Sequence, residues 1–269
     1  MRPDHGGTSS NEQPPVCAQP IRIACIGDSL TRGDGRHETW RKRSPRSLEG
    51  RGNYPMLLSS LLGASADVRN FGHGGTTACN GSNSPYQQTR EYRRAIKFRP
   101  HLLVLMLGTN DAKDTHWGLG CDATTLTEGL TAIRASLGMP PSVIFEPPPI
   151  LREKWAIRKT LLKVTRTVVQ SYVSNSGCSA VYLGHHARAL HSPSPARLFI
   201  ADGVHLSVQG SNLLACSVVD ALVSWRGLIQ RGAEGQRCGE SSRGTWDNLS
   251  CTSWIPGTWM ERCHTLGWG

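Results

Sequence analysis

The sequence predicts an α/β protein, specifically a three-layer α/β/α flavodoxin-like sandwich around a five-stranded parallel sheet. Short apolar, partly β-branched runs alternate along the chain with segments of helical periodicity, which is the pattern of repeated βαβ units. At 269 residues the chain is also long enough to bury a sizeable core. Five runs are strand-like: 21–26, 67–71, 102–107, 143–145 and 180–183.

Three segments are expected to form helices that cover this sheet. In 54–62 the apolar residues recur at spacings of three and four, and Gly63 closes the run. The segment 122–137 shows the same spacing. A last core helix is expected over about 207–225, with Ser207 as its N-cap, so its start would fix the position of the turn that precedes it.

A candidate nucleophile, Ser29, follows the first strand in the sequence Gly27-Asp28-Ser29-Leu30. Ligands of open α/β sheets bind at the carboxyl ends of the strands, where a serine is accessible and close to free backbone N–H groups. A serine hydroxyl attacks effectively only when a base takes its proton and donors stabilise the oxyanion that forms. The alternative is that Asp28 or Ser29 only caps the following helix.

Asp202 and His205 are the candidates for the rest of a catalytic triad. They lie three residues apart in a turn just before the last helical segment. At this spacing the carboxylate can hold the imidazole in one tautomer and stabilise it once it is protonated. The alternative is a hydrogen bond that only starts the helix.

Two other segments supply candidate oxyanion donors besides the N–H of Ser29 itself. Gly75 belongs to a glycine-rich turn after the second strand, where the backbone can approach a ligand closely. Asn110, in Gly108-Thr109-Asn110-Asp111 after the third strand, is expected to point its amide N–H at the oxyanion. Taken singly, a chain-reversing glycine turn and an Asx turn remain the alternatives.

Together these segments resemble the SGNH or GDSL-type hydrolases, whose four blocks contribute a Ser, a Gly, an Asn and a His. The matching residues are Ser29, Gly75, Asn110 and His205, with Asp202 completing the triad. The resemblance covers roughly residues 20–225 and is closest to bacterial carbohydrate O-acetylesterases of the sialate O-acetylesterase kind. It implies the SGNH hydrolase fold and a serine esterase that removes short acyl groups, most of all acetyl, from a carbohydrate through an acyl-enzyme.

Substrate contacts are expected from Asp28, Trp117 and Trp155. The two tryptophans, together with Trp40, fall in or near loops at the predicted active edge, and aromatic faces suit sugar rings. Core packing is the alternative for at least one of them. The basic segment 36–51 is expected to be an enlarged loop near Ser29, which leaves the substrate preference open.

Two other functions stay open. Within the same fold, the protein would be a lipid esterase, lysophospholipase or thioesterase. From a different class, it would be a non-catalytic module that binds glycans or polyanions. The formal charge is +10, but the basic residues are spread over several segments without a nucleic-acid-binding motif, so no specific nucleic-acid partner is predicted. A positive field would favour an anionic glycan as substrate.

Nine cysteines without a Cys-x-x-Cys pair predict neither a zinc site nor a complete disulfide framework, and no metal or cofactor is expected. Cys25 and Cys216 lie in apolar patterns and are expected to be buried thiols. Cys79 and Cys121 follow the second and third blocks. Where their loops meet at the active edge, these two cysteines are candidates for a disulfide.

The predicted domain organisation has three parts. Residues 1–19 are expected to be a disordered polar N-terminus, 20–226 the hydrolase domain, and 227–269 an extension of unknown role that contains Cys and Trp. No secretory signal and no apolar run of membrane-spanning length is visible, so a cytoplasmic location is the default expectation. The oligomeric state is not predicted.

Overall fold

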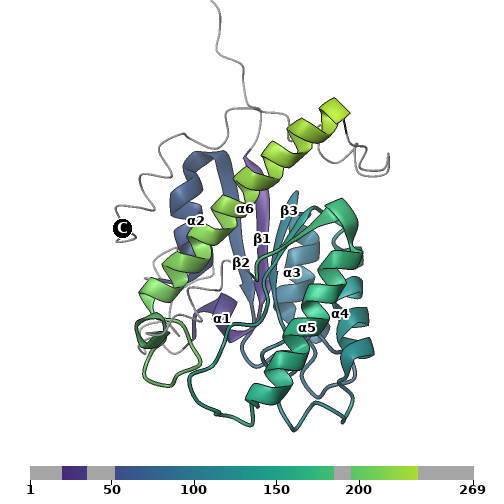
Figure 1. Cartoon of the computed structure of the whole chain (residues 1–269), viewed down its shortest axis with the longest axis vertical. Coiled ribbons are helices and arrows are strands. Elements are labelled where there is room, and N and C mark those ends of the chain that lie inside the picture. The colour runs from purple at the N-terminus through teal and green to yellow at the C-terminus, as the bar shows by residue number, and fades with distance from the viewer. Residues whose placement is uncertain (1–19, 35–51, 185–194, 236–269) are drawn as a thin grey trace, which may run out of the picture.

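The predicted sandwich is confirmed by the computed structural model, which describes residues 20–34, 52–184 and 195–235. All neighbouring strands pair in parallel, in the order β2-β1-β3-β4-β5 (Figure 1). Their carboxyl ends therefore lie at one edge of the sheet. The strands are β1 (Ile21–Gly27), β2 (Ala66–Gly72), β3 (Leu102–Met106), β4 (Ser142–Ile144) and β5 (Ala180–Tyr182).

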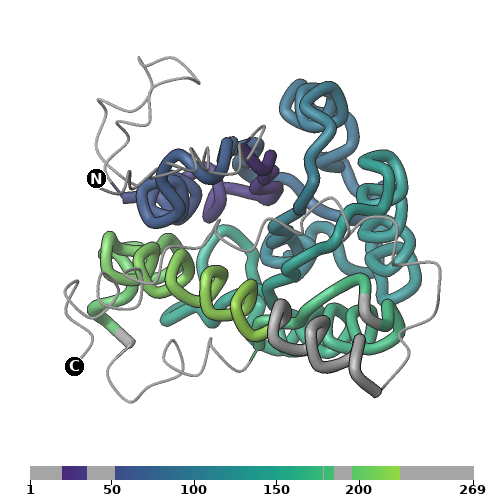
Figure 2. Tube along the Cα trace, turned by 90° about the horizontal axis from the view of Figure 1, so that it is seen from above, coloured from purple at the N-terminus to yellow at the C-terminus, as the bar shows by residue number. Residues whose placement is uncertain are grey.

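Helices cover both faces of the sheet (Figures 1 and 2). One core contains Ile23 and Cys25 of β1 and lies under α2 (Tyr54–Leu62) and α6 (Val208–Gly235). The other contains Ala24 and Ile26, because successive residues of a strand point to opposite faces. It lies under α3 (Arg90–Phe98), α4 (Ala123–Ser136) and α5 (Lys159–Asn175).

The three expected helices form at the expected places, and one of them is longer than expected. Helix α2 has the predicted bounds, and α4 starts with a capping box at Asp122. Helix α6 follows Ser207, whose hydroxyl accepts from the N–H of Gly210 at 3.1 Å. It continues to Gly235, so the helix runs through the boundary expected near residue 226. Residues 1–19, 35–51 with Trp40, and 236–269 lie outside the described residues.

Short helices complete the connections. The four-residue α1 (Ser29–Arg32) follows β1 directly. A Cβ at Gly27 would lie 2.1 Å from the Thr31 hydroxyl oxygen and 2.5 Å from the Met106 carbonyl oxygen, so only glycine lets α1 turn back so tightly over the strand end. The 3₁₀ helices are η2 (Gly63–Ser65), η3 (Tyr86–Gln88), η4 (Gly177–Ser179) and η6 (Pro195–Leu198).

A buried arginine fastens α4 to the opposite edge of the sheet. Arg134 is 1% exposed, and its guanidinium donates to the hydroxyls of Ser142 at 3.1 Å, Ser176 at 3.2 Å and Ser179 at 3.0 Å. It also donates to the Tyr172 hydroxyl and stacks over that ring. Helices α4 and α5 and the start of β4 are thereby held together. None of the described helices is both long and apolar enough to cross a membrane.

Candidate active site

The predicted nucleophile lies at the carboxyl edge of the sheet, as the first residue of α1. Asp28, directly before it, is the N-cap, and its Oδ1 accepts from the N–H of Leu30 at 2.9 Å. This cap fixes the turn and leaves Ser29 half-buried at the sheet edge. Within the described residues, the backbone N–H of Ser29 has no hydrogen-bond acceptor, so it is free to meet a ligand.

Asp202 and His205 form the hydrogen bond that their spacing predicts. His205 Nδ1 lies 2.7 Å from Asp202 Oδ2, while Asp202 Oδ1 accepts from the N–H groups of Val204 at 2.8 Å and of His205 at 2.9 Å. Partial burial alone would raise the pKa of Asp202, but the hydrogen bonds from the imidazole and the two N–H groups hold that pKa below its ordinary value. Asp202 therefore stays ionised, and His205 Nε2 is left as the basic nitrogen.

No hydrogen bond joins the Ser29 hydroxyl to the His205 imidazole. The two blocks are instead connected through the segment 151–158. The N–H of Leu151 donates to the carbonyl of Gly203 at 2.8 Å, and the N–H of Asp114 donates to the carbonyl of Ala156 at 3.0 Å. This segment thus fastens the turn that carries His205 to the loop that follows β3. Hydrogen bonds between catalytic groups often tighten only when substrate binds.

Trp155 lies on this connecting segment beside the candidate base. Its ring centroid is 5.3 Å from that of His205, and the ammonium of Lys154 lies 4.6 Å from the indole centroid. The Trp155 backbone has a φ of +51°, which is strained for a bulky side chain. The residue is 49% exposed. The ring is therefore not packed in the core and stands beside the candidate base.

The other two expected substrate contacts point into the protein. Trp117 is half-buried and packs against the core under α4, so for this residue the packing alternative describes what is observed. Asp28 is fully buried, and its Oδ2 accepts from the amide of Asn110 at 3.2 Å. Burial raises the pKa of Asp28 to about 7. Asp28 therefore binds Leu30 and Asn110 within the protein and is not exposed to solvent.

Asn110 connects three of the predicted blocks. Its amide nitrogen donates to the Asp28 carboxylate and to the carbonyl of Thr76, the latter at 3.1 Å. The amide that is expected to face an oxyanion thus has two acceptors within the protein. The bond to Asp28 ties the loop after β3 to the nucleophile turn, and the bond to Thr76 ties it to the glycine-rich loop.

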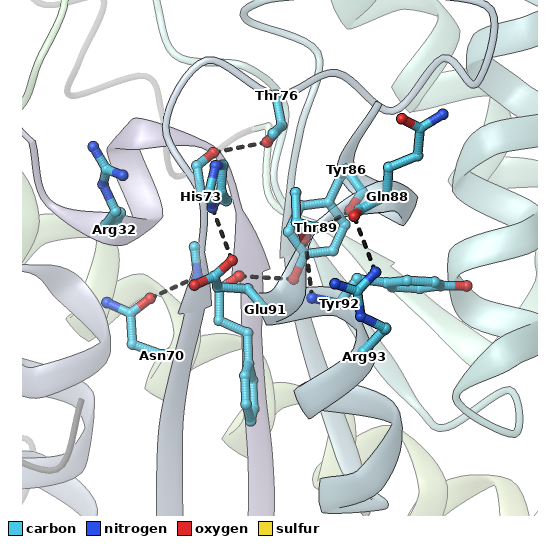
Figure 3. A network of polar contacts seen from close by, with 12 residues as sticks. Arg32, Asn70, His73, Thr76, Tyr86, Gln88, Thr89, Glu91, Tyr92 and Arg93 are labelled. Carbon is cyan, nitrogen blue, oxygen red and sulfur yellow. Dashed lines mark hydrogen bonds and ion pairs between the residues drawn. The ribbon is translucent and has the colours of Figure 1, made fainter. Parts of the chain in front are cut away.

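The glycine-rich loop after β2 is held in place by side chains around it. Gly75 has a φ of +82°, and a Cβ there would meet no atom within 4 Å, so glycine is required by the backbone conformation and not by space. On one side the Thr76 hydroxyl donates to the carbonyl of His73 at 2.7 Å, and His73 Nδ1 lies 2.8 Å from Glu91 Oε2 (Figure 3). The N–H of Gly75 has no acceptor among the described residues.

A buried carboxylate and a disulfide lock the continuation of this loop onto the next block. Asp111 Oδ1 accepts from the N–H groups of Ala78 at 2.9 Å and Cys79 at 3.0 Å. Burial raises the pKa of Asp111 to about 6. The two candidate cysteines, Cys79 and Cys121, form a disulfide, with 5.4 Å between the Cα atoms. The loops after β2 and β3 are therefore covalently joined.

Two other cysteines, Cys25 and Cys216, and one candidate group of metal ligands also bear on the expectations. Cys25 is a free, buried thiol as expected, whereas the same expectation for Cys216 is wrong because that cysteine is disulfide-bonded. In the described ranges one group has metal-ligand atoms close together, Cys79, Asp111 and Cys121. Its two sulfurs are joined to each other, so they do not offer thiolates to a metal.

Several residues that hold the site were not assigned a role from the sequence. His116 contacts the Asn110 carbonyl, Asp111 anchors the glycine-rich loop, and Lys154 covers the Trp155 ring. None of these contacts follows from helical or strand periodicity, because all three residues lie in loops.

Comparisons with known proteins identify the family of the chain. A model of the GDSL-like Lipase/Acylhydrolase family matches residues 25–213. An acetylxylan esterase of Xylanibacter ruminicola is 26% identical over an alignment of 221 residues that covers 75% of this chain and 43% of that protein. The chain therefore spans less than half the length of this curated relative.

Solved structures share the fold. Axe2, an acetylxylan esterase from Geobacillus stearothermophilus, aligns with a TM-score of 0.57 and 19% identity, covering 75% of this chain and 94% of that one. A lipase/acylhydrolase from Enterococcus faecalis has a TM-score of 0.55 and 20% identity, covering 75% and 95%. Est24, a carbohydrate acetylesterase from Sinorhizobium meliloti, has a TM-score of 0.55 and 15% identity, covering 76% and 99%. Since the family match spans most of the chain and includes every predicted block, the protein belongs to the GDSL-like lipase/acylhydrolase family.

Proposed function

We propose that the protein is a serine esterase that hydrolyses short acyl esters, acetyl esters above all, on carbohydrates. The observation that carries this proposal is the carboxylate-held imidazole of His205, whose Asp202 partner lies 2.7 Å away. The imidazole lies at the same edge of the sheet as Ser29. The segment 151–158 joins the turn that carries His205 to the loop after β3, and Asn110 of that loop binds Asp28 next to Ser29. A base, its orienting carboxylate and a hydroxyl are the parts that acyl transfer needs.

The reaction has two halves. Ser29 Oγ attacks the ester carbonyl while His205 Nε2 takes the hydroxyl proton, and the resulting imidazolium is stabilised by Asp202. Collapse of the tetrahedral intermediate breaks the bond to the sugar oxygen, which leaves with the proton from His205. Water then attacks the acyl-enzyme, again losing a proton to His205, and acetate is released as Ser29 recovers its proton.

The oxyanion is stabilised by the N–H groups of Ser29 and Gly75, which have no acceptor among the described residues. The Asn110 amide is the third donor. One of its N–H groups turns from Asp28 to the substrate oxygen, exchanging a 3.2 Å hydrogen bond for one to a full oxyanion charge. Removing one such donor costs about 10² to 10³ in turnover, so Asn110→Ala is expected to be folded and severely impaired.

A carbohydrate as the alcohol part of the ester is supported by two kinds of observation. The relative from Xylanibacter ruminicola is named an acetylxylan esterase, and solved structures with the same fold include esterases of acetylated carbohydrates. In this chain, the exposed indole of Trp155 beside His205 offers a flat apolar face to a sugar ring. Lys154 adds a positive charge at that ring, which favours acidic sugars.

The test compares acetate release from acetylated xylo-oligosaccharides by the wild type, Ser29→Ala and Ser136→Ala. Ser136 is an exposed residue of α4 and serves as the matched control. We expect release by the wild type and Ser136→Ala and none by Ser29→Ala. Full activity in Ser29→Ala would refute the proposed nucleophile. Faster hydrolysis of p-nitrophenyl decanoate than of the acetate would instead assign the protein to lipid esterases or thioesterases.

A further inference from the structure

His116 is a buried histidine that the proposed mechanism does not use. It lies in the loop after β3, six residues beyond Asn110, and is 5% exposed. Both of its ring nitrogens have partners. Nδ1 is 2.9 Å from the backbone carbonyl oxygen of Asn110, and Nε2 is 2.9 Å from Asn83 Oδ1. The imidazole thus bridges two loops at the active edge.

The chemistry of these partners sets the tautomer of the ring. A backbone carbonyl only accepts hydrogen bonds, so Nδ1 carries the proton and donates to Asn110. Burial lowers the pKa of His116, and the nearby Lys113 acts in the same direction, although the bond to Asn110 opposes them. The neutral ring then offers Nε2 as an acceptor. The structure places Asn83 Oδ1 at Nε2, and with a neutral ring the hydrogen-bond network requires the flipped amide, whose NH₂ group donates to Nε2.

The position of the bridge connects it to the oxyanion donors. Asn83 belongs to the loop that begins with Gly75, and the Asn110 carbonyl also accepts from the N–H of Lys113 at 3.1 Å. His116 thus binds the backbone carbonyl of Asn110, while the side-chain amide of Asn110 binds Asp28 and Thr76. A shift of about 1 Å in a catalytic group can cost on the order of 10²-fold in rate.

We propose that His116 is a positioning residue of the oxyanion hole, which holds the Asn110 peptide at a fixed distance from the loop that carries Gly75. The inference rests on the proposed function, since it requires Asn110 to be an oxyanion donor. The imidazole touches neither substrate nor Ser29. It acts through Asn110, so its contribution disappears when the Asn110 amide is absent.

The side chain can be tested apart from the local turn. The turn around His116 is made by backbone bonds, from the N–H of His116 to the Lys113 carbonyl and from the N–H groups of Leu119 and Cys121 to the His116 carbonyl. Substitution of residue 116 leaves these groups in place. His116→Asn puts an amide N–H near the position of Nδ1 and keeps the donor to Asn110, whereas His116→Gln reaches the position of Nε2 and keeps only the contact with Asn83.

The experiment is a double-mutant cycle on p-nitrophenyl acetate with His116→Ala, Asn110→Ala and the combination. We expect His116→Ala to lower kcat about 10- to 100-fold with KM changed less than about threefold, and to cost less than about twofold when Asn110 is already alanine. His116→Asn should recover most of the lost kcat and His116→Gln little of it. Circular dichroism and urea unfolding check that each variant is folded.

Several outcomes would overturn the inference: an unchanged kcat in His116→Ala, a loss that adds fully to that of Asn110→Ala, or equal recovery by His116→Asn and His116→Gln. Should His116→Ala fail to fold, the comparison of the Asn and Gln variants still decides the question. The proposed function is tested separately by Ser29→Ala. If Ser29→Ala is inactive and the losses from Asn110→Ala and His116→Ala are additive, the positioning role of His116 is rejected while the proposed function stands.

Discussion

The disulfide between Cys79 and Cys121 should supply a large part of the stability of the active edge. It joins residues that are 42 positions apart in the sequence. A cross-link restricts the unfolded chain, and for a loop of this length the lost entropy corresponds to about 4 kcal/mol at 25 °C. Replacing both cysteines with alanine is therefore expected to lower the free energy of unfolding by about 4 kcal/mol, in addition to the packing lost with two buried sulfurs.

The effect should arise in the unfolded state more than in the native one. The native loop retains the hydrogen bonds from Ala78 and Cys79 to Asp111, and Gln87 still donates to the Ala78 carbonyl at 3.1 Å. The denatured chain of the double variant, in contrast, is free to expand. We therefore expect a lower urea midpoint together with a steeper dependence of the unfolding free energy on urea.

Urea unfolding without reductant, followed by tryptophan fluorescence, measures both quantities. Cys25→Ala is the matched control, because it removes one buried sulfur that forms no cross-link. Twice its effect approximates the packing loss in the double variant. If the double variant, after this correction, unfolds within about 1 kcal/mol of the wild type, the entropic reasoning is refuted.

Three further predictions concern single side chains. Asp202→Asn should lower kcat on p-nitrophenyl acetate by about 10⁴-fold, because the amide no longer holds His205 in the required tautomer; a loss below about tenfold would contradict the triad. Arg134→Ala should lower the urea unfolding free energy by about 3 kcal/mol or more, and an unchanged midpoint would show that its hydrogen bonds add no net stability. Asp28 has a folded pKa of about 7, above the unfolded value, so its ionisation makes stability fall as pH rises from about 4 to 7, by up to about 4 kcal/mol. Asp28→Asn should flatten this fall while Glu128→Gln, on the exposed face of α4, should not.

The strands and the best-marked helices were predictable because their signals are local. Most strands are short apolar runs, and α2 shows its buried stripe at spacings of three and four. Helices α3 and α5 carried no such clear signal. In α3 only Ala95 and Phe98 are buried among basic residues, and α5 is rich in β-branched residues that favour strands. Packing on the sheet makes α5 helical against its β-branched composition, whereas α3 consists largely of good helix formers and lacks only a wide apolar stripe.

The same distinction applies to the site. The Asp202 to His205 bond spans three residues, so the spacing already made the pair a candidate. The bond from Asn110 to Asp28 spans 82 residues, and the bond from His116 to Asn83 spans 33. The expectation for Asn110 considered its amide only against an incoming oxyanion. As the N-cap of α1, Asp28 is held so that its second carboxylate oxygen accepts from the Asn110 amide. This contact results from tertiary packing, which residue spacing in the sequence does not predict.

This contact between Asp28 and Asn110 leads to a prediction about pH. Above about pH 7 the buried Asp28 carboxyl ionises, its bond from the Asn110 amide becomes charge-assisted, and the amide is less available to an oxyanion. Burial lowers the pKa of the half-buried Lys113, although Asp28 and Asp111 oppose this shift. Its ammonium offsets part of the negative charge that Asp28 gains on ionisation. Turnover of p-nitrophenyl acetate should therefore decline as pH rises from about 7 to 9, and the decline should be shallower in Asn110→Ala, in which there is no amide to compete for. An equally steep decline in that variant would mean that Asp28 acts on the reaction by its charge alone, and a flat profile in the wild type would mean that it does not act at all.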